Sequence, residues 1–316
     1  MPDISVIVLN WNNAAATTRC LRGVSRLDGG PFQLVVVDNG STDDSCETLA
    51  HRFPSVELLR LTTNLGYGGG NNQGLRHALA GRPDYILILN NDVVPARDMV
   101  TRLVPALEAD PRAAMVGPKI LCECPANTVF SVGSFIQWSR GDIRHLGMFE
   151  SLEAWPDRDG VRRVDFLVGC GLLARASFVR EAGFLDEQYY LNFEDVEWGT
   201  RAWRAGYSVG LVSGARLWHG VSETLGMASP ANTYYMTRNA LRFFRSQAKA
   251  GLRWLPVSCI LLRTLRTVCA WTVRSRYRDE WFARKRKANC LAVRDFFRGQ
   301  FGRMGPDVAH VCYPNG

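Results

Sequence analysis

Hydrophobic positions in the first hundred residues fall into short runs that are separated by polar segments. Three runs rich in β-branched and apolar residues, at 4–9, 33–37 and 85–89, are bounded by turn residues and predict buried parallel strands. Segments with helical spacing follow them, and we predict helices over 14–27, 44–52 and 71–80. This alternation of strands and helices predicts an α/β fold built on a doubly wound open sheet.

Beyond residue 95 the pattern is less regular. We predict helices over 98–108 and 193–205, the second capped by Asn192 and ended by Gly206, and the further strands 115–121, 164–174 and 209–218. The stretch 128–160 is mixed, and a hairpin or an acceptor-binding loop would both suit it. From residue 234 the chain is apolar, Arg-rich and helix-like, so we expect a C-terminal helical extension.

Charge is concentrated in that extension. The chain has 316 residues and a formal net charge of +8, but residues 249–303 carry 14 Lys and Arg against three acids, a local +11. The remainder is therefore about −3, which argues against a nucleic-acid-binding protein. An anionic membrane surface or an acidic partner would suit the extension better.

Two interpretations of the extension stay open. Its most apolar part, 252–274, is interrupted by Arg253, Arg263 and Arg266, and the uncharged stretch 254–262 is far shorter than the roughly 20 residues that span a bilayer. An amphipathic helix of this kind packs on the main domain or on a second copy in a homodimer. It also suits an interfacial helix that lies on an anionic leaflet.

Composition and cysteine usage exclude several protein classes. With 47% hydrophobic and 22% charged residues the chain is an ordinary globular protein. Nine cysteines without a Cys-x-x-Cys pair argue against a zinc knuckle or a disulfide framework. No basic segment precedes the first apolar run, so we expect no signal peptide. We expect a cytoplasmic protein, peripheral on the inner face of the membrane if the extension binds lipid.

Polar clusters follow the three early strands, at 10–13, 38–43 and 90–92. Turn formation explains any one of them, because Asn, Asp, Gly and Ser favour turns and helix caps. In open α/β sheets, however, ligands bind beyond the carboxyl ends of the strands. Three clusters on that side together predict a site that holds a base, a ribose and a diphosphate.

The segment 64–74, NLGYGGGNNQG, predicts a glycine-rich loop that leads into a helix and lets the backbone approach an anion. A dinucleotide fingerprint needs glycines at relative positions one, three and six, which no register here provides. A Walker A loop fails as well, because Leu75 and Arg76 stand where Lys and Ser or Thr are needed. A dehydrogenase or an NTPase is therefore not favoured.

Two further sets of side chains are candidates for catalysis or metal binding. Glu194, Asp195 and Glu197 lie in the first turn of a predicted helix, where the helix dipole favours acids even without a catalytic role. His219 ends an apolar strand, where a structural role is the alternative. If His219 converges on Asp92, the pair and phosphate oxygens would form a shell for a divalent metal such as Mg²⁺ or Mn²⁺.

In this order and spacing, the clusters resemble the family 2 inverting glycosyltransferases of the GT-A fold, and within them the bacterial rhamnosyltransferase-like subgroup. The matching segments are VIVLNWNN at 6–13, VVVDNGSTDDS at 35–45, NLGYGGGNNQG at 64–74, LILNND at 87–92, VGCGLLAR at 168–175, GFLDEQYYLNFEDVEWGTR at 183–201, the region of His219, and YMTRN at 235–239. We therefore expect a glycosyltransferase domain over 1–245, with a Rossmann-like mixed sheet, and a basic amphipathic extension over 246–316.

The resemblance also implies roles for individual residues. Those implied to bind the nucleotide or donor are Leu9, Asn10, Asn12, Asp38, Asn64, Gly69, Asn91 and Arg201. Asp92 and His219 would bind the metal, Asp195 would be the catalytic base, and the residues implied on the acceptor side are Glu194, Trp218 and Arg238. Two departures stand out, since Asn90 replaces the first acid of an Asp-x-Asp motif and Glu197 replaces a common Asp.

The implied activity is metal-dependent, inverting transfer of a sugar from a nucleoside-diphosphate donor to an acceptor hydroxyl. dTDP-rhamnose is the favoured donor, and a UDP-sugar is the next. The acceptor is a glycan or a lipid-linked glycan, with a soluble small molecule (a natural product or an aminoglycoside) as the alternative. A non-catalytic protein that binds nucleotide sugars is the alternative outside enzymes.

Overall fold

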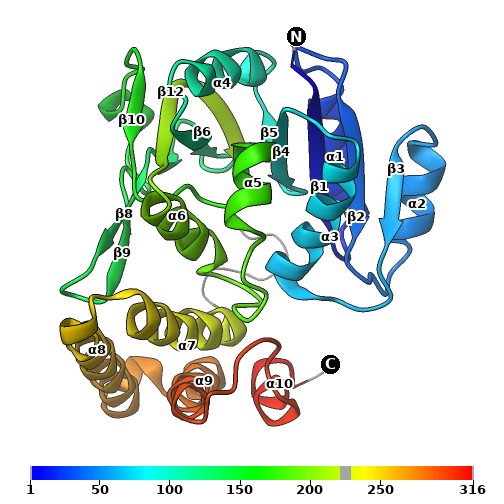
Figure 1. Cartoon of the computed structure of the whole chain (residues 1–316). Coiled ribbons are helices and arrows are strands. Elements are labelled where there is room, and N and C mark those ends of the chain that lie inside the picture. The colour runs from blue at the N-terminus through cyan, green and yellow to red at the C-terminus, as the bar shows by residue number, and fades with distance from the viewer. Residues whose placement is uncertain (1, 221–228, 315–316) are drawn as a thin grey trace. The chain divides into compact units, whose positions relative to one another are not determined.

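The computed structural model describes residues 2–220 and 229–314 (Figure 1). Contacts within the chain divide it into two compact units. Unit 1 comprises Met1–Phe135, His145–Asp186 and Asp195–Thr224, and unit 2 comprises Ile136–Arg144, Glu187–Glu194 and Leu225–Gly316. The expected division at residues 245 and 246 separates a catalytic from a non-catalytic segment, which these contacts do not test, so it stays a prediction.

Unit 1 is built on a mixed sheet. Its strands are β1 (Ile4–Asn10), β2 (Gln33–Asp38), β3 (Glu57–Arg60), β4 (Tyr85–Asn90), β5 (Val93–Pro95), β6 (Ala113–Cys122), β7 (Val129–Ser131), β10 (Val161–Arg163), β11 (Gly171–Arg175) and β12 (Ser208–His219). The main order is β10-β12-β6-β11-β4-β1-β2-β3. β1 to β4 run parallel, whereas β11 is antiparallel to both β4 and β6. This arrangement confirms the predicted Rossmann-like mixed sheet.

Helices cover both faces of this sheet. They are α1 (Ala14–Val24), α2 (Ser45–Arg52), α3 (Gly66–Ala80), α4 (Met99–Glu108), α5 (Ala176–Ala182) and α6 (Glu194–Arg204). Because successive side chains of a strand point to opposite faces, Val6 and Val8 of β1 join the hydrophobic cluster under α1, α2 and α4, whereas Ile7 joins the cluster under α3, α5 and α6. The result is a three-layer α/β/α unit.

The glycine-rich segment is not a loop, which corrects the prediction for 64–74. α3 begins at Gly66, so its glycines form the first turns of a helix that lies against β1 and β2. A Cβ atom at Gly70 would lie 2.6 Å from Cδ1 of Leu9, and one at Gly74 would lie 2.6 Å from Cγ2 of Ile7. These glycines therefore allow close approach of a helix to the sheet.

The predicted strand 164–174 is shorter than expected, because only Gly171–Arg175 forms β11. Gly169 and Cys170 use backbone groups to bond Asp195 and Asn90 instead. The end of α6 agrees with the prediction, since Gly206 has φ +83°. The N–H of Gly206 donates to the carbonyl of Trp203, and the N–H of Tyr207 donates to the carbonyl of Ala202. This is the Schellman pattern of a helix C-terminus.

Unit 2 contains α7 (Pro230–Gln247), α8 (Trp254–Val273), α9 (Glu280–Phe297) and α10 (Pro306–Cys312). Their core includes Tyr234, Tyr235, Ala288, Ala292 and Val308. These helices confirm the expected helical extension. The hairpin of β8 (Ser134–Gln137) and β9 (Asp142–His145), expected within 128–160, has its tip in unit 2. None of the helices within the described ranges combines the length and apolarity that crossing a membrane requires.

Candidate active site

A buried hydrogen-bond network joins the carboxyl ends of β1, β2 and β4. The register of the parallel strands sets Asn10 opposite Asp38. Nδ2 of Asn10 donates to Oδ1 of Asp38 at 2.7 Å, and Oδ1 of Asn10 accepts from the hydroxyl of Thr17 at 2.6 Å. Nδ2 of Asn91 donates to the same hydroxyl at 3.1 Å. Three residues that the resemblance implied for nucleotide binding are thus linked, Asn10 and Asn91 through the threonine and Asp38 through Asn10.

Asn12 and Asn64 stabilise the turns beside this network. Asn12 has φ +50°, and its side-chain oxygen accepts from the N–H of Thr42 at 2.7 Å. The side-chain oxygen of Asn64 accepts from the N–H of Gly66 at 2.8 Å and from Nδ2 of Asn39 at 3.2 Å. Asn39 had not been singled out from the sequence, although it stands in the polar cluster 38–43.

Leu9 and Gly69 complete the predicted nucleotide side. Leu9 is half-buried on β1, and Gly69 is buried within α3, one residue before the glycine that contacts Leu9. Both lie beside the network at the end of β1. Nucleotide binding by these residues stays a prediction, as it does for Asn10, Asn12, Asp38, Asn64 and Asn91.

Asp92 and His219 meet although they come from different parts of the sheet. Asp92 follows β4, and His219 is the last residue of β12, which pairs with β5 so that His219 lies opposite Val93. Nε2 of His219 is 3.3 Å from Oδ1 of Asp92, and both side chains are buried. The N–H of Gly220 donates to the carbonyl of Asp92 at 2.8 Å, which ties the end of β12 to this turn.

The donor atoms around Asp92 fit a divalent cation. Oδ1 of Asp92, Oδ1 of Asn90 and Nδ1 of His219 are buried and have no hydrogen-bond partner among the described residues. Burial acts to raise the pKa of Asp92, but the imidazole of His219 and nearby amides outweigh it, so the pKa lies below its ordinary value. The described residues contain no group of three or more His, Cys, Asp or Glu side chains at metal-binding distance. Phosphate and water oxygens would have to complete a Mg²⁺ or Mn²⁺ shell here.

Asp195 lies in the first turn of α6 and is half-buried. Its Oδ2 accepts from the N–H of Gly169 at 3.0 Å, and its Oδ1 accepts from the N–H of Val196 at 2.8 Å. Burial in the protein raises its pKa to about 6, although the two backbone N–H groups act to lower it. At neutral pH this carboxylate is charged and more basic than an ordinary Asp, which suits a general base.

The segment 169–171 lies between the metal candidates and Asp195. The carbonyl of Cys170 accepts from the N–H of Asn90 at 3.0 Å, and the hydroxyl of Tyr67 donates to the carbonyl of Gly169. Burial raises the pKa of the Cys170 thiol, and the charges of Asp92 and Asp195 raise it further. Both carboxylates therefore flank Cys170, and the site is continuous within unit 1.

Tyr67 was not singled out from the sequence, and its role follows from the close packing at Gly169. A Cβ atom at this position would lie 2.7 Å from the hydroxyl of Tyr67, so a side chain would displace it. Tyr67 thus holds the segment that binds Asp195. The glycine interruption within an apolar run was the available sequence signal, but it did not indicate which side chain would fill the space.

Arg201 and Trp218 have mainly structural contacts. The guanidinium of Arg201 pairs with Glu197 and donates to the carbonyls of Ala182 at 2.7 Å and Phe184 at 2.8 Å. These bonds connect α6 to the segment after α5. Trp218 is half-buried on β12, next to His219, and packs against the hydrophobic cluster under α6. Binding of the donor by Arg201 and of the acceptor by Trp218 stay predictions.

Glu194 and Arg238 belong to unit 2. Glu194 is buried at the start of α6. Arg238 is buried in the core of the helices, where it donates to the hydroxyl of Tyr234 at 3.2 Å and lies over the ring of Tyr235. The hydroxyl of Tyr234 in turn donates to Asp295 at 2.7 Å. Arg238 therefore connects α7 to α9, and its implied acceptor-side role stays a prediction, as does that of Glu194.

Two protein-family models match segments of the chain that contain these site residues. The model described as "Glycosyl transferase family 2" matches residues 5–155, which include both the network at Asn10 and Asp92. The model described as "Glycosyl transferase family group 2" matches residues 85–277, more than half of the chain, including Asp92, Asp195 and His219. The chain belongs to glycosyl transferase family group 2. It is a glycosyltransferase, as the resemblance of its motifs implied.

Curated relatives agree with this assignment. The chain is 29% identical over 301 residues to N-acetylglucosaminyl-diphospho-decaprenol L-rhamnosyltransferase of Mycobacterium tuberculosis, covering 88% of this chain and 97% of the relative. It is 19% identical over 251 residues to a dTDP-rhamnosyl transferase of Shigella flexneri, covering 77% and 80% of the two chains.

Among solved structures, a mannosyltransferase from Pyrobaculum calidifontis in complex with GDP-mannose and Mn²⁺ superposes with a TM-score of 0.56. It is 16% identical, and the alignment covers 95% of this glycosyltransferase and 90% of the other chain. At this identity the similarity concerns the fold alone, and it confirms the expected GT-A fold.

Proposed function

We propose that this glycosyltransferase is metal-dependent and inverting, and that it moves L-rhamnose from dTDP-rhamnose to a hydroxyl of a lipid-linked glycan. The observation that carries the proposal is that one short segment contacts both groups: the N–H of Gly169 donates to Asp195, and the carbonyl of Cys170 accepts from Asn90, two residues before Asp92. A single displacement of a nucleoside diphosphate requires a carboxylate with a raised pKa and a group that binds a cation.

Asp195 is the base in this proposal. As the acceptor oxygen forms its bond to the anomeric carbon, its proton passes to a carboxylate oxygen of Asp195, and the bond from the anomeric carbon to the diphosphate oxygen breaks on the opposite face. The N–H groups of Gly169 and Val196 orient the carboxylate through one lone pair on each oxygen. Because no second carboxylate is used as a nucleophile, the configuration is inverted in one step.

Asp92, Asn90 and His219 would hold a divalent cation through Oδ1 of Asp92 and Oδ1 of Asn90, which are buried without a partner among the described residues, and through Nε2 of His219, which faces Asp92. When bound, such a cation would neutralise charge on the departing diphosphate. The low pKa of Asp92 keeps its carboxylate ionised and ready for this role. Asn10, Asp38 and Asn91 form a buried polar network at the strand ends, where we place the nucleotide.

The donor and acceptor are proposed from the relatives. Both curated relatives are named as rhamnosyl transferases, one with a dTDP donor and one with a diphospho-decaprenol acceptor. The relative with the lipid-linked acceptor aligns over nearly its whole length. We therefore rank dTDP-rhamnose above UDP-sugars, and a lipid-linked glycan above a soluble small molecule.

A thermal-shift panel tests the proposal. Purified protein is heated with dTDP, UDP, GDP or ADP, each with and without Mn²⁺. Because a ligand that binds only the folded state raises the melting temperature, dTDP with Mn²⁺ should give the largest shift and dTDP with EDTA little or none. A larger shift with UDP would replace dTDP-rhamnose by a UDP-sugar as the donor, and a flat panel with folded protein would contradict nucleotide binding at this site.

We also propose that unit 2 binds an anionic membrane surface through α8. Large apolar side chains are exposed along this helix: Trp254 53%, Leu255 49%, Leu262 48%, Leu265 58% and Val273 74%. At 100° per residue these five lie within about one third of the helix circumference, and Arg266 lies on the same face. α8 contains no acidic residue. An apolar face with an arginine at its edge is complementary to anionic lipid headgroups.

Flotation with vesicles tests this surface. The protein should float with vesicles of phosphatidylglycerol and phosphatidylcholine, and not with phosphatidylcholine alone. The double variant Leu262→Ser, Leu265→Ser should stay at the bottom of the gradient, whereas Phe297→Ser, which changes an equally exposed side chain on α9, should float. If instead the wild type does not float with vesicles but forms a dimer, and the double variant stays a monomer, the apolar face of α8 is a homodimer surface.

A further inference from the structure

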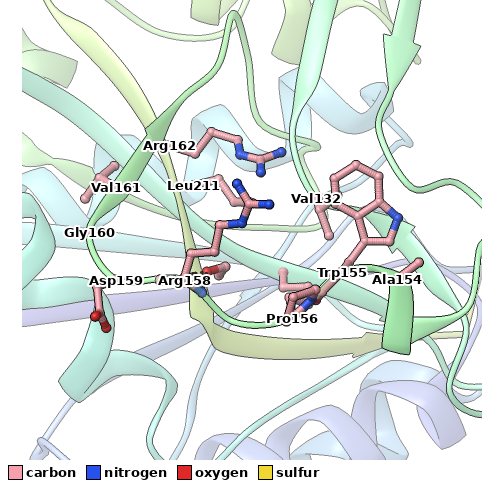
Figure 2. Close-up of a pocket in the computed structure, with 12 residues that line it drawn as sticks. Val132, Ala154, Trp155, Pro156, Arg158, Asp159, Gly160, Val161, Arg162 and Leu211 are labelled. Carbon is pink, nitrogen blue, oxygen red and sulfur yellow. Dashed lines mark hydrogen bonds between the residues drawn. The ribbon is translucent and has the colours of Figure 1, made fainter.

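A cavity of about 430 Å³ lies in unit 1, among β6, β10, β12 and the segment 154–160 (Figure 2). Leu211 and Ser213 of β12 line it, six or more residues before His219 on the same strand. At about 3.3 Å per residue, that separation is roughly 20 Å along the strand. None of the residues proposed for the donor, metal or base lines the cavity, so it is a separate site.

Two arginines give this cavity its charge. Figure 2 shows the side chains of Arg158 and Arg162 directed into the cavity, on the side that faces the indole of Trp155. The guanidinium of Arg162 lies over that ring, 5.6 Å from its centroid. Neither guanidinium pairs with a carboxylate among the described residues. Asp159 also lines the cavity, but Figure 2 shows its carboxylate directed away from both arginines.

Asp157 is the nearby carboxylate that could neutralise Arg158 and Arg162, but it already pairs with two other cations. Asp157 accepts from Nζ of Lys119 at 2.7 Å through Oδ1, and from Arg216 at 2.7 Å through Oδ2. Lys119 is 1% exposed and also donates to the carbonyl of Trp155 at 2.6 Å, which fixes the wall of the cavity. One carboxylate thus serves two other cations, and Asp159, the acid that lines the cavity, is directed away from Arg158 and Arg162 (Figure 2).

We infer that this cavity binds a phosphate group. Two like charges that face one small volume repel each other, and an oxyanion between them removes that cost. Guanidinium groups bind phosphate oxygens through parallel N–H donors, and two of them match the charge of about −1.5 to −2 that a phosphate monoester carries near pH 7. The cavity is large enough for a sugar or glycerol that carries the phosphate, with Trp155 as its apolar wall.

Titration with inorganic phosphate in EDTA tests the inference, because the donor site then has no cation to hold phosphate. Calorimetry at constant ionic strength would compare the wild type with the double variant Arg158→Gln, Arg162→Gln. Arg163→Gln is the matched control, because it removes the next arginine of β10, which does not line the cavity. We expect the double variant to bind about a hundredfold more weakly, and the control to bind like the wild type.

The outcomes separate clearly. Equal phosphate binding in all three proteins, or none in the wild type, would overturn the inference. Glucose 6-phosphate and glycerol 3-phosphate distinguish the source, since tighter binding of either than of inorganic phosphate indicates a phosphorylated sugar or a lipid headgroup. The melting temperature of the double variant without phosphate should change little, because it loses the contact of Arg162 over Trp155 together with a repulsion, and it loses no ion pair. Failure of this test leaves the proposed transferase activity untouched.

Discussion

Nε2 of His219 lies 3.3 Å from Oδ1 of Asp92, although one residue ends β12 and the other follows β4. The short strand β5 makes this possible, because it pairs with the end of β12 immediately after the Asp92 turn. The pair is the most direct structural support for a cation site in this glycosyltransferase.

Replacement of Asp92 by Ala should abolish the stabilisation that Mn²⁺ adds to nucleotide binding. The variant loses the only carboxylate of the Asp92–His219 pair, so the cation would have only the imidazole, the side-chain oxygen of Asn90 and the diphosphate. Thermal shift with dTDP and Mn²⁺, before and after EDTA, measures this. Asp28→Ala, which breaks a surface ion pair with Arg97, is the control and should retain the metal-dependent shift. An unchanged shift in Asp92→Ala would remove Asp92 from the metal site.

Replacement of Asp195 by Asn should reduce sugar transfer by a factor of about 10²–10⁴. An amide cannot accept the acceptor proton, and general base catalysis typically contributes a factor of about 10²–10⁴. Binding of dTDP with Mn²⁺ should remain within about twofold of wild type, because the variant keeps its volume. Calorimetry and a radiolabelled transfer assay measure the two quantities. Transfer within a fewfold of wild type would show that another group is the base.

The transfer rate should fall on the acid side with an apparent pKa near 6. Burial raises the pKa of Asp195 to about 6, and the base acts only when it is deprotonated. Transfer should therefore be nearly constant above pH 7 and fall about tenfold per pH unit below pH 6. Rates of kcat/KM between pH 4.5 and 8, with folding checked by circular dichroism, measure the profile. An acid limb near pH 4 would indicate an ordinary carboxyl.

Gly74→Ala should destabilise unit 1 by about 1–3 kcal/mol, the cost of overpacking a dense core. Its Cβ would lie 2.6 Å from Cγ2 of Ile7 and 3.0 Å from Cγ2 of Val37, so α3 would have to move away from the sheet. Gly251→Ala is the control, since a Cβ there meets no described atom within 4 Å. Urea denaturation compares the two, and equal midpoints would show that α3 adjusts freely.

Local pattern in the sequence accounts for most of the sheet and part of the site. β1, β2 and β4 appear as apolar runs because buried parallel strands need apolar residues on both faces. The polar residues at their ends follow from the same rule, since the chain leaves the core there. Asn10, Asp38 and Asp92 could therefore be named without a structure, and the order of the motifs identified the family.

The tertiary structure determined the contacts between residues that are far apart in the sequence. The glycines of 66–74 predicted a loop, because glycine lowers helix propensity, but packing of α3 against Leu9 and Ile7 overrides that local cost. The role of Tyr67 depends on the space left at Gly169, and the charge of the phosphate cavity depends on which arginines Asp157 leaves unpaired. Such contacts join segments far apart in the chain, so only the folded structure determines them.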